Sequence, residues 1–112
     1  MEMKIETLAD DITKVNLEGR LDILGAQQID LHFNVIVASQ RKVIVDLEQV
    51  LFLASMGIRT LIIGAKTVKL KGGRMVLLRP SADVHKVLTA MGTDTVIPIV
   101  HDLETAISAV SG

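Results

Sequence analysis

Residues 43–61 read VIVDLEQVLFLASMGIRTL, and this stretch decides the fold. Its first part, Val43–Leu47, is apolar except for Asp46, a pattern typical of a central strand that is covered on both faces. We expect a polar loop after this strand and then an amphipathic helix that begins at Ser55. The stretch therefore predicts a strand–loop–helix unit with one serine at the junction.

The helix expected over Met56–Leu70 has two different faces. At about 100° per residue, one apolar set gathers on a single side and is predicted to face the core: Ile58, Leu61, Ile62, Ala65 and Val68. A second set lies almost opposite and is predicted to face water: Met56, Thr60, Ile63 and Thr67. This second stripe carries no charge, and we interpret it as a docking surface. The alternative is that single exposed apolar residues have no role.

Shorter patterns place the remaining elements around this unit. Strands are predicted over Lys4–Leu8, Ile12–Leu17 (ended by Gly19), Met75–Leu78 and Val96–Val100, the last at a sheet edge because of Pro98. Helices are predicted over Leu24–Ala38, from Ser81 to Gly92, and after Asp102, with turns at Asp10-Asp11 and Lys71-Gly72-Gly73. The order is ββαβαβαβα. It predicts an α/β fold with a central mixed sheet of four or five strands and about four helices.

Composition limits the function classes that fit this chain. At 112 residues it has room for one domain, 1–112, and with Phe33 and Phe52 as its only aromatic residues it needs an aliphatic core. A net charge of −1 argues against nucleic-acid binding. There is no cysteine, no signal-peptide pattern and no apolar run near the ~20 residues of a membrane helix. We therefore expect a cytoplasmic protein that is not inserted in a membrane.

Ser55 is the candidate functional residue. A helix N-terminus presents free backbone N–H groups and a positive dipole potential, and both favour a phosphate. Arg59, one turn further along the helix, could pair with a phosphoserine. The alternative is that Ser55 is an ordinary N-cap without a regulatory role.

Other arrangements of polar residues predict no enzyme, cofactor or metal site. Asp10, Asp11 and Asp46 suggest the acidic pocket of a phospho-acceptor receiver domain, but the first two lie in a hairpin turn. The three histidines show no metal-ligand spacing, and no cysteine accompanies them. No nucleophile elbow surrounds Ser55, and the Gly72-Gly73 turn does not continue into a phosphate-binding loop.

The stretch at residues 43–61 resembles the signature of STAS domains of the anti-sigma factor antagonist type. Three further segments resemble the same family: GRLD at residues 19–22, KGGRMVL at 71–77 and PSADVHKVL at 80–88. The resemblance extends over roughly Ile12–Val110. It implies a STAS-like fold whose order of elements agrees with the order predicted above.

The resemblance also implies a partner switch. In regulatory members, the unphosphorylated protein binds an anti-sigma factor that is also a serine kinase, and this binding releases the sigma factor. The kinase phosphorylates the serine at the start of the second helix, and a serine phosphatase of the PPM type resets the system. Carried onto this chain, the phosphorylated residue is Ser55. Together with the uncharged stripe of the helix and the neighbouring Arg59, this gives the expected partner-binding residues: Asp22, Ala54, Ser55, Met56, Gly57, Arg59, Thr60 and Ile63. Asp22 could equally be a residue that initiates the first helix.

The chain departs from the family pattern on both sides of the serine. The usual Asp-Ser-Ser/Thr-Gly is here Ala54-Ser55-Met56-Gly57. Loss of the acid makes an added phosphate less costly electrostatically, but it could also remove a feature that the kinase recognises. A rival hypothesis is therefore a constitutive STAS subunit of a lipid-transport ABC complex, in which the serine is structural.

Overall fold

The computed structural model describes all 112 residues as one α/β domain. Its strands are β1 (Glu2–Leu8), β2 (Ile12–Leu21), β3 (Lys42–Leu53), β4 (Arg74–Leu78) and β5 (Ile99–Val100). Its helices are α1 (Ile23–Ser39), α2 (Ser55–Leu70), α3 (Ala82–Ala90) and α4 (Leu103–Ser111), with 3-10 turns at Ala9–Asp11 and Thr93–Thr95. The predicted order ββαβαβαβα is confirmed.

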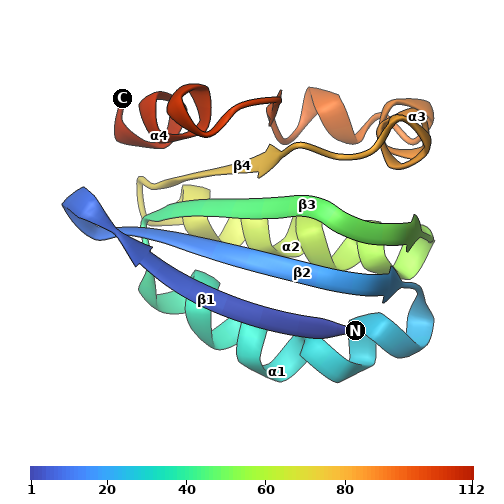
Figure 1. Ribbon diagram of the computed structural model, residues 1–112. Helices are drawn as coiled ribbons and strands as arrows, with labels where there is room; N and C mark the ends of the chain where they lie inside the picture. Colours follow the sequence, from blue (N-terminus) through green and yellow to red (C-terminus); the bar gives the residue numbers. More distant parts are fainter.

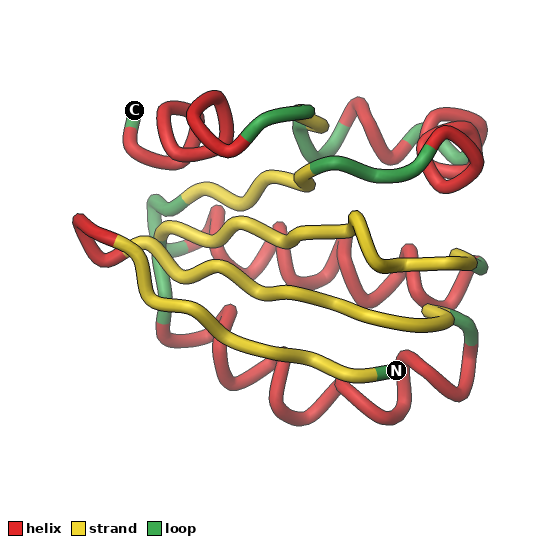
Figure 2. The backbone as a smooth tube through the Cα atoms, viewed as in Figure 1, coloured by secondary structure: helices red, strands yellow, loops and turns green.

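The strands lie in the sheet in the order in which they follow one another in the chain, β1-β2-β3-β4-β5 (Figures 1 and 2). β1 and β2 are antiparallel, and every later pair is parallel. The sheet is therefore mixed and five-stranded, as predicted. The parallel strands β2 and β3 finish at the same end of the sheet, on the right in Figure 1, and α1 and α2 begin there.

Two apolar clusters hold the layers together. The larger one contains 20 buried residues and joins one face of the sheet to α1, α2 and α3. The smaller one contains six and fixes α4 against the opposite face of β3 and β4. Phe33 is fully buried, and its ring lies against α2 at Gly64, where a Cβ would come within 2.6 Å of it. The core is otherwise aliphatic, as the composition predicts.

The expected ends of β2 and β3 are wrong. Gly19 was expected to end β2 and a polar loop was expected after Leu47, but β2 continues to Leu21 and β3 to Leu53. The two extensions pair with each other, with register shifts at Asn16/Glu18 and at Gly19/Arg20. Because each extension supplies the other with hydrogen-bond partners, neither is visible in one segment taken alone.

Asp46 consequently lies inside β3 rather than at its end. Its carboxylate pairs with Lys14 at 3.2 Å and with Arg79 at 3.4 Å on the sheet face opposite α1 and α2. It also accepts the backbone N–H of Glu48 at 2.9 Å. Asp10 and Asp11 occupy the predicted turn and are separate from this carboxylate. Asp46 therefore belongs to an ion-pair network, which excludes the acidic pocket of a receiver domain.

Candidate functional site

The candidate site is built where β2 and β3 end side by side. Leu21 is the register partner of Leu53, and the backbone N–H of Ala54 donates to the carbonyl of Leu21 at 3.1 Å. This bond ties the residue before Ser55 to the residue before Asp22. Two segments more than thirty positions apart in the chain are thereby fixed against each other.

Two glycines allow the helices to start so close to the sheet. A Cβ on Gly57 would lie 2.4 Å from the Leu21 carbonyl oxygen, and a Cβ on Gly25 would lie 2.0 Å from that of Arg20. Real Cβ atoms do not approach backbone so closely, so both positions require glycine. The Gly57 that the family signature contains thus has a packing role here.

The two helix starts differ in how their free N–H groups are satisfied. Asp22 is the N-cap of α1, and its carboxylate accepts the Gly25 N–H at 2.8 Å. The N-cap of α2 is Ala54, which has no side-chain acceptor. Ser55 is therefore the first residue of the helix and not its N-cap, so the ordinary capping role considered for this serine does not apply.

The N-terminus of α2 is a place of positive potential. Its first intrahelical bond runs from Ile58 N–H to the Ala54 carbonyl at 3.1 Å. The N–H groups of Ser55, Met56 and Gly57 precede this bond and have no partner in the helix. With the helix dipole, they favour an anion at this position.

Asp22 is held in its ionised form. The hydrogen bond from the Gly25 backbone N–H lowers the pKa of its carboxyl group, and Arg20 lowers it further. The Arg20 Nε lies 3.4 Å from the Asp22 carboxylate. The geometry thus confirms that Asp22 initiates α1, and it places this carboxylate at the sheet end that also carries Ser55.

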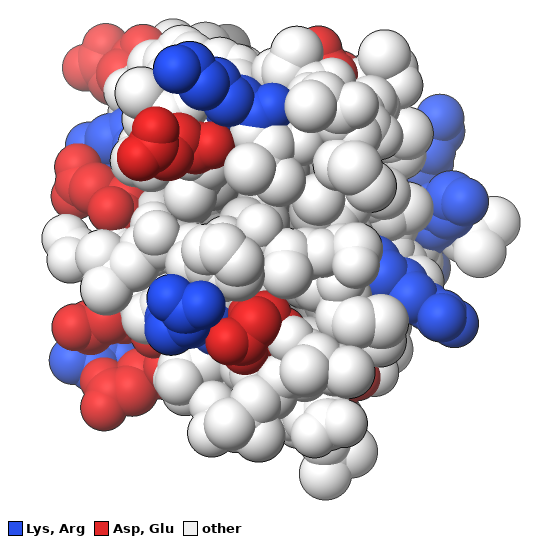
Figure 3. Space-filling model, turned by 90° about the vertical axis from the view of Figure 1, so that its right-hand side faces the viewer, with Lys and Arg blue, Asp and Glu red and all other residues white.

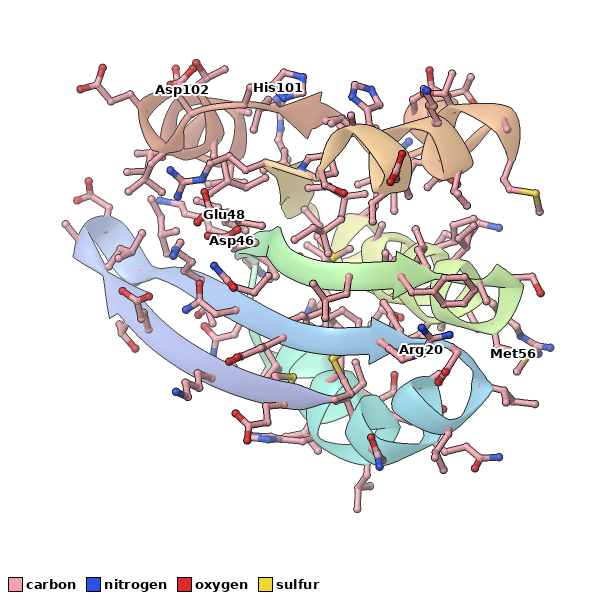
Figure 4. The ribbon with its side chains drawn as sticks, turned by 45° about the vertical axis from the view of Figure 1, so that its right-hand side comes forward. Arg20, Asp46, Glu48, Met56, His101 and Asp102 are labelled. Atoms are coloured by element: carbon pink, nitrogen blue, oxygen red, sulfur yellow. The ribbon has the colours of Figure 1, made fainter.

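Arg20 joins Asp22 to the end of β3. Its guanidinium lies 4.2 Å from the centre of the Phe52 ring, a cation–π contact across the register pair Arg20–Phe52. Figure 4 shows Arg20 and Met56 at the same end of the molecule, from β2 and α2 respectively. Ser55 itself is exposed.

Exposed apolar side chains lie at the same end of the sheet as the serine. Ile23 (58% exposed) and Leu24 (61%) come from the start of α1, Leu51 (79%) and Phe52 (41%) from the end of β3, and Met56 (39%) from α2. Seen from this end, the surface in Figure 3 is mostly uncharged in its middle, apart from one basic side chain beside an acidic one, and other charged side chains lie toward its edges. We call these five residues together with Ser55 the Ser55 face. It has the character of a protein-binding surface.

The predicted docking stripe along α2 is only partly present. Of its four residues, Met56 and Ile63 are exposed as expected, Thr67 is half-buried and Thr60 is only 6% exposed. Arg59, which flanks the stripe, is exposed. The Thr60 hydroxyl lies 3.2 Å from the Asp30 carboxylate of α1 and 3.2 Å from the Met56 carbonyl. Thr60 therefore joins two helices and cannot contact a partner. The prediction failed because a helical wheel does not show where a neighbouring helix packs.

The core face of α2 follows the prediction more closely. Ile58, Leu61 and Val68 are buried. Ile62 and Ala65 are partly buried and pack against the larger cluster. The register of the helix is therefore right, apart from the side that α1 covers.

Sequence reasoning missed most of the Ser55 face. Leu51 and Phe52 lie where a polar loop was expected, and Ile23 and Leu24 belong to another helix. The available signal was Phe52, one of two aromatic residues, placed three positions before Ser55. What unites these residues is the pairing of β2 with β3, which no single segment reveals.

Comparison with known proteins gives a consistent family assignment. The STAS domain family model matches residues 5–106. Among solved structures, an anti-sigma factor antagonist from Mycobacterium paratuberculosis superimposes with a TM-score of 0.88 at 21% identity, covering 99% of this chain and 94% of that one. A STAS domain protein from Planctomyces limnophilus gives 0.83 at 26% identity, covering 96% and 95%.

The Bacillus cell fate determinant SpoIIAA, solved in its phosphorylated form, is also similar. It has a TM-score of 0.73 at 22% identity, covering 96% of this chain and 97% of that one. None of the helices described here combines the length and apolar character needed to cross a bilayer. By the extent of the family match and the agreement in fold, this chain belongs to the STAS domain family.

Proposed function

We propose that this protein is an anti-sigma factor antagonist that works by partner switching. In its unphosphorylated form it binds an anti-sigma serine kinase through the Ser55 face, and phosphorylation of Ser55 ends the complex. A serine phosphatase of the PPM type restores the binding form. The observation that carries this proposal is an exposed serine at the uncapped start of α2, at the end of the sheet that also exposes several apolar side chains.

The fold tolerates a phosphate at this position. A phosphoserine adds about −1.5 to −2 charges at neutral pH. The free N–H groups of α2 and the exposed Arg59, one turn along, favour that charge. Phosphorylation should therefore leave the stability of the domain nearly unchanged.

Binding responds differently, because docking must remove water from the Ser55 face. Covering Leu51, Phe52 and Met56 with a partner removes apolar surface from water, which favours binding. A phosphate among them would have to lose its hydration in the same contact, and without a cation from the partner this cost opposes docking. Phosphorylation should therefore change affinity much more than stability.

The departures from the family pattern fit this scheme. Ala54 replaces the usual acid, so no carboxylate beside Ser55 repels the phosphate. Met56 replaces the usual hydroxyl and adds apolar area to the face. Partners of this chain should therefore present a more apolar contact at this point than partners of members with the usual residues.

The first test is phosphopeptide analysis of the protein purified from its native host. The expected result is a form heavier by one phosphoryl group, with the modification at Ser55. Ser81 is the matched control, since it also stands at a helix start but its hydroxyl oxygen accepts the Val84 N–H at 3.3 Å. Modification at Ser81 in place of Ser55 would refute the assignment.

The second test measures binding to an anti-sigma kinase from the same genome. Enzymatically phosphorylated protein should bind the kinase more weakly than the unmodified form, and its melting temperature should be unchanged. The Ser55→Ala variant should bind the kinase but should not be released when ATP is added. If Ser55 is never modified and the protein copurifies with a permease and an ATPase, the rival transport-complex role is correct. Loss of folding on phosphorylation would contradict the switch.

A further inference from the structure

β5 is much shorter than the predicted strand Val96–Val100. Only Ile99 and Val100 pair with β4, at Leu77 and Leu78. The N–H groups of Val96 and Ile97 instead donate to the Thr93 carbonyl at 3.0 and 2.9 Å, which bends this segment into the 3-10 turn. The first half of β4, residues 74–76, is therefore left without a neighbour on this edge.

The open edge presents a backbone donor. Leu77 N–H and Arg79 N–H donate to the Pro98 and Val100 carbonyls, each at 2.9 Å. Because backbone N–H groups alternate in direction along a strand, the Met75 N–H points to this same side. No backbone carbonyl accepts it there. A backbone N–H on an unpaired strand edge can pair with an added strand.

A cavity of about 410 Å³ runs along this edge. Residues of β4 and the turn before it line this cavity, namely Gly73, Arg74, Met75 and Val76, and so do Val96 and Pro98 from the segment before β5. Ala65 of α2 and Ala109 of α4 also line it, so the space lies beside the sheet between helices that pack on its opposite faces. We call this space the β4 slot.

Two cations flank the β4 slot. Lys69 and Arg74 line it, both are exposed, and the ion pairs of the molecule involve neither of them. The lining contains no acidic side chain. The slot therefore favours an occupant that is anionic, and its apolar walls favour one that also carries apolar groups.

We propose that the β4 slot is a second interaction surface, which binds an extended acidic peptide segment of a partner protein. The segment adds to the sheet edge as a strand next to residues 74–76, and one of its carbonyls accepts the Met75 N–H. Its acidic side chains pair with Lys69 and Arg74, and small apolar side chains enter between Ala65 and Ala109. A peptide fits better than a small anion because the free edge offers backbone pairing along a line.

The β4 slot is separate from the Ser55 face. β4 begins at the end of the sheet opposite the start of α2 (Figure 1). A partner in the slot therefore leaves Ser55 accessible, and the domain can hold two proteins at once. The inference stands whether or not Ser55 is phosphorylated.

The test begins with selection of a phage-displayed library of random short peptides on the immobilised full chain. Enriched peptides should be acidic and free of proline. Synthetic versions, titrated into the ¹⁵N-labelled protein, should shift the amide signals of Arg74, Met75 and Val76 more than those of the Ser55 face. N-methylation of the peptide backbone should abolish these shifts, because it removes the strand hydrogen bonds.

Charge reversal provides the matched variants. Lys69→Glu with Arg74→Glu should weaken binding by about tenfold or more, whereas Lys4→Glu with Lys86→Glu, exposed and outside the slot, should have little effect. Enrichment of neutral or basic peptides, or shifts confined to another surface, would overturn the proposal. If oleate shifts the amide signal of Met75 and peptides do not, the slot is a lipid site and the proposal is wrong. A protein dimer that dissociates in the Lys69/Arg74 variant would likewise overturn the proposal.

Discussion

The starts of α1 and α2 are alike in position and different in chemistry. Both follow parallel strands at the same end of the sheet, and both approach β2 so closely that glycine is required. The residues before them, Asp22 and Ala54, share an extended backbone, with φ of −101° and −120°. Only Asp22 has a side chain that caps its helix. The fold therefore provides two equivalent helix starts, and a side chain accepts a free backbone N–H group at only one of them.

The difference teaches where stability and function are separated in this domain. At α1, a carboxylate uses the helix N-terminus for its own stabilisation. At α2, packing and the bonds of Ala54 to Leu21 and of Thr60 to Asp30 hold the helix, and no side chain caps its N-terminus. In this chain no carboxylate occupies the start of α2, so its free N–H groups remain available to an added anion, as the proposed phosphorylation of Ser55 requires.

The largest expected effect tests whether packing holds α2 in place. Leu61 is fully buried, so Leu61→Ala should lower the free energy of unfolding by ~2–5 kcal/mol. Ile63, 45% exposed on the same helix, is the control, and Ile63→Ala should cost well under ~1 kcal/mol. Urea denaturation measures both. Similar midpoint shifts for the two variants would show that the assigned faces are wrong.

The next effect tests whether the two helix starts are equivalent. Gly25→Ala and Gly57→Ala each push a methyl group into a backbone carbonyl, so each should cost ~1–3 kcal/mol despite the better helix propensity of alanine. Gly112→Ala is the control, because a Cβ there comes no closer than 3.5 Å to its neighbours. A large loss at only one of the two glycines, measured by thermal unfolding, would break the equivalence.

Adding a cap to α2 and removing the cap from α1 should change the stability of the domain in opposite directions. Ala54→Asp supplies the missing cap at a residue with suitable backbone and should add about 0.5–1 kcal/mol of stability. Asp22→Ala removes the existing cap and should lower the melting temperature. Ala54→Asp should also slow phosphorylation of Ser55, because the new carboxylate repels the phosphate that is added to the neighbouring serine. Differential scanning calorimetry and a timed kinase assay measure the two effects, and unchanged stability in both variants would contradict the comparison.

The smallest effect is in the pH dependence of stability. The pKa of Asp22 is lowered in the fold, chiefly by the Gly25 N–H, so its contribution is fully present above its ordinary value near 3.8 and is lost as the pH falls through the lowered value. The stability difference between wild type and Asp22→Asn should therefore shrink on acidification below that value. Asparagine at the equivalent N-cap position of α2, Ala54→Asn, should give a stability difference from wild type that does not depend on pH in this range. A difference that is constant from neutral to acidic pH would exclude the ionised cap.

Local patterns in the sequence predicted the elements well, and failed where elements meet. The order of strands and helices, the caps at Ser81 and Asp102 and the turn at Asp10-Asp11 follow from short-range chemistry. The lengths of β2 and β3 do not, because each extension depends on its partner strand. Likewise Val96–Ile97 read as a strand from composition, while bonds to Thr93 turn them away from the sheet.

The candidate site shows the same division. The place of Ser55 at a helix start could be predicted, since it needs only the change from strand pattern to helical periodicity. Thr60 was misplaced because its partner, Asp30, comes from α1. The apolar residues around Ser55 come from three elements, so only the assembled sheet reveals them as one surface.

The order of the strands in the sheet also bears on how the chain acquires its fold. Each strand pairs with the strands that precede and follow it in sequence. A short turn joins β1 to β2, whereas each parallel pairing closes a longer loop that contains a helix, as between Thr13 and Val43. The sheet can grow from β1 to β5 as the chain leaves the ribosome, with each helix crossing over before the next strand is added. Because non-local parallel pairings form slowly, we expect the β1–β2 hairpin to form before the parallel part of the sheet.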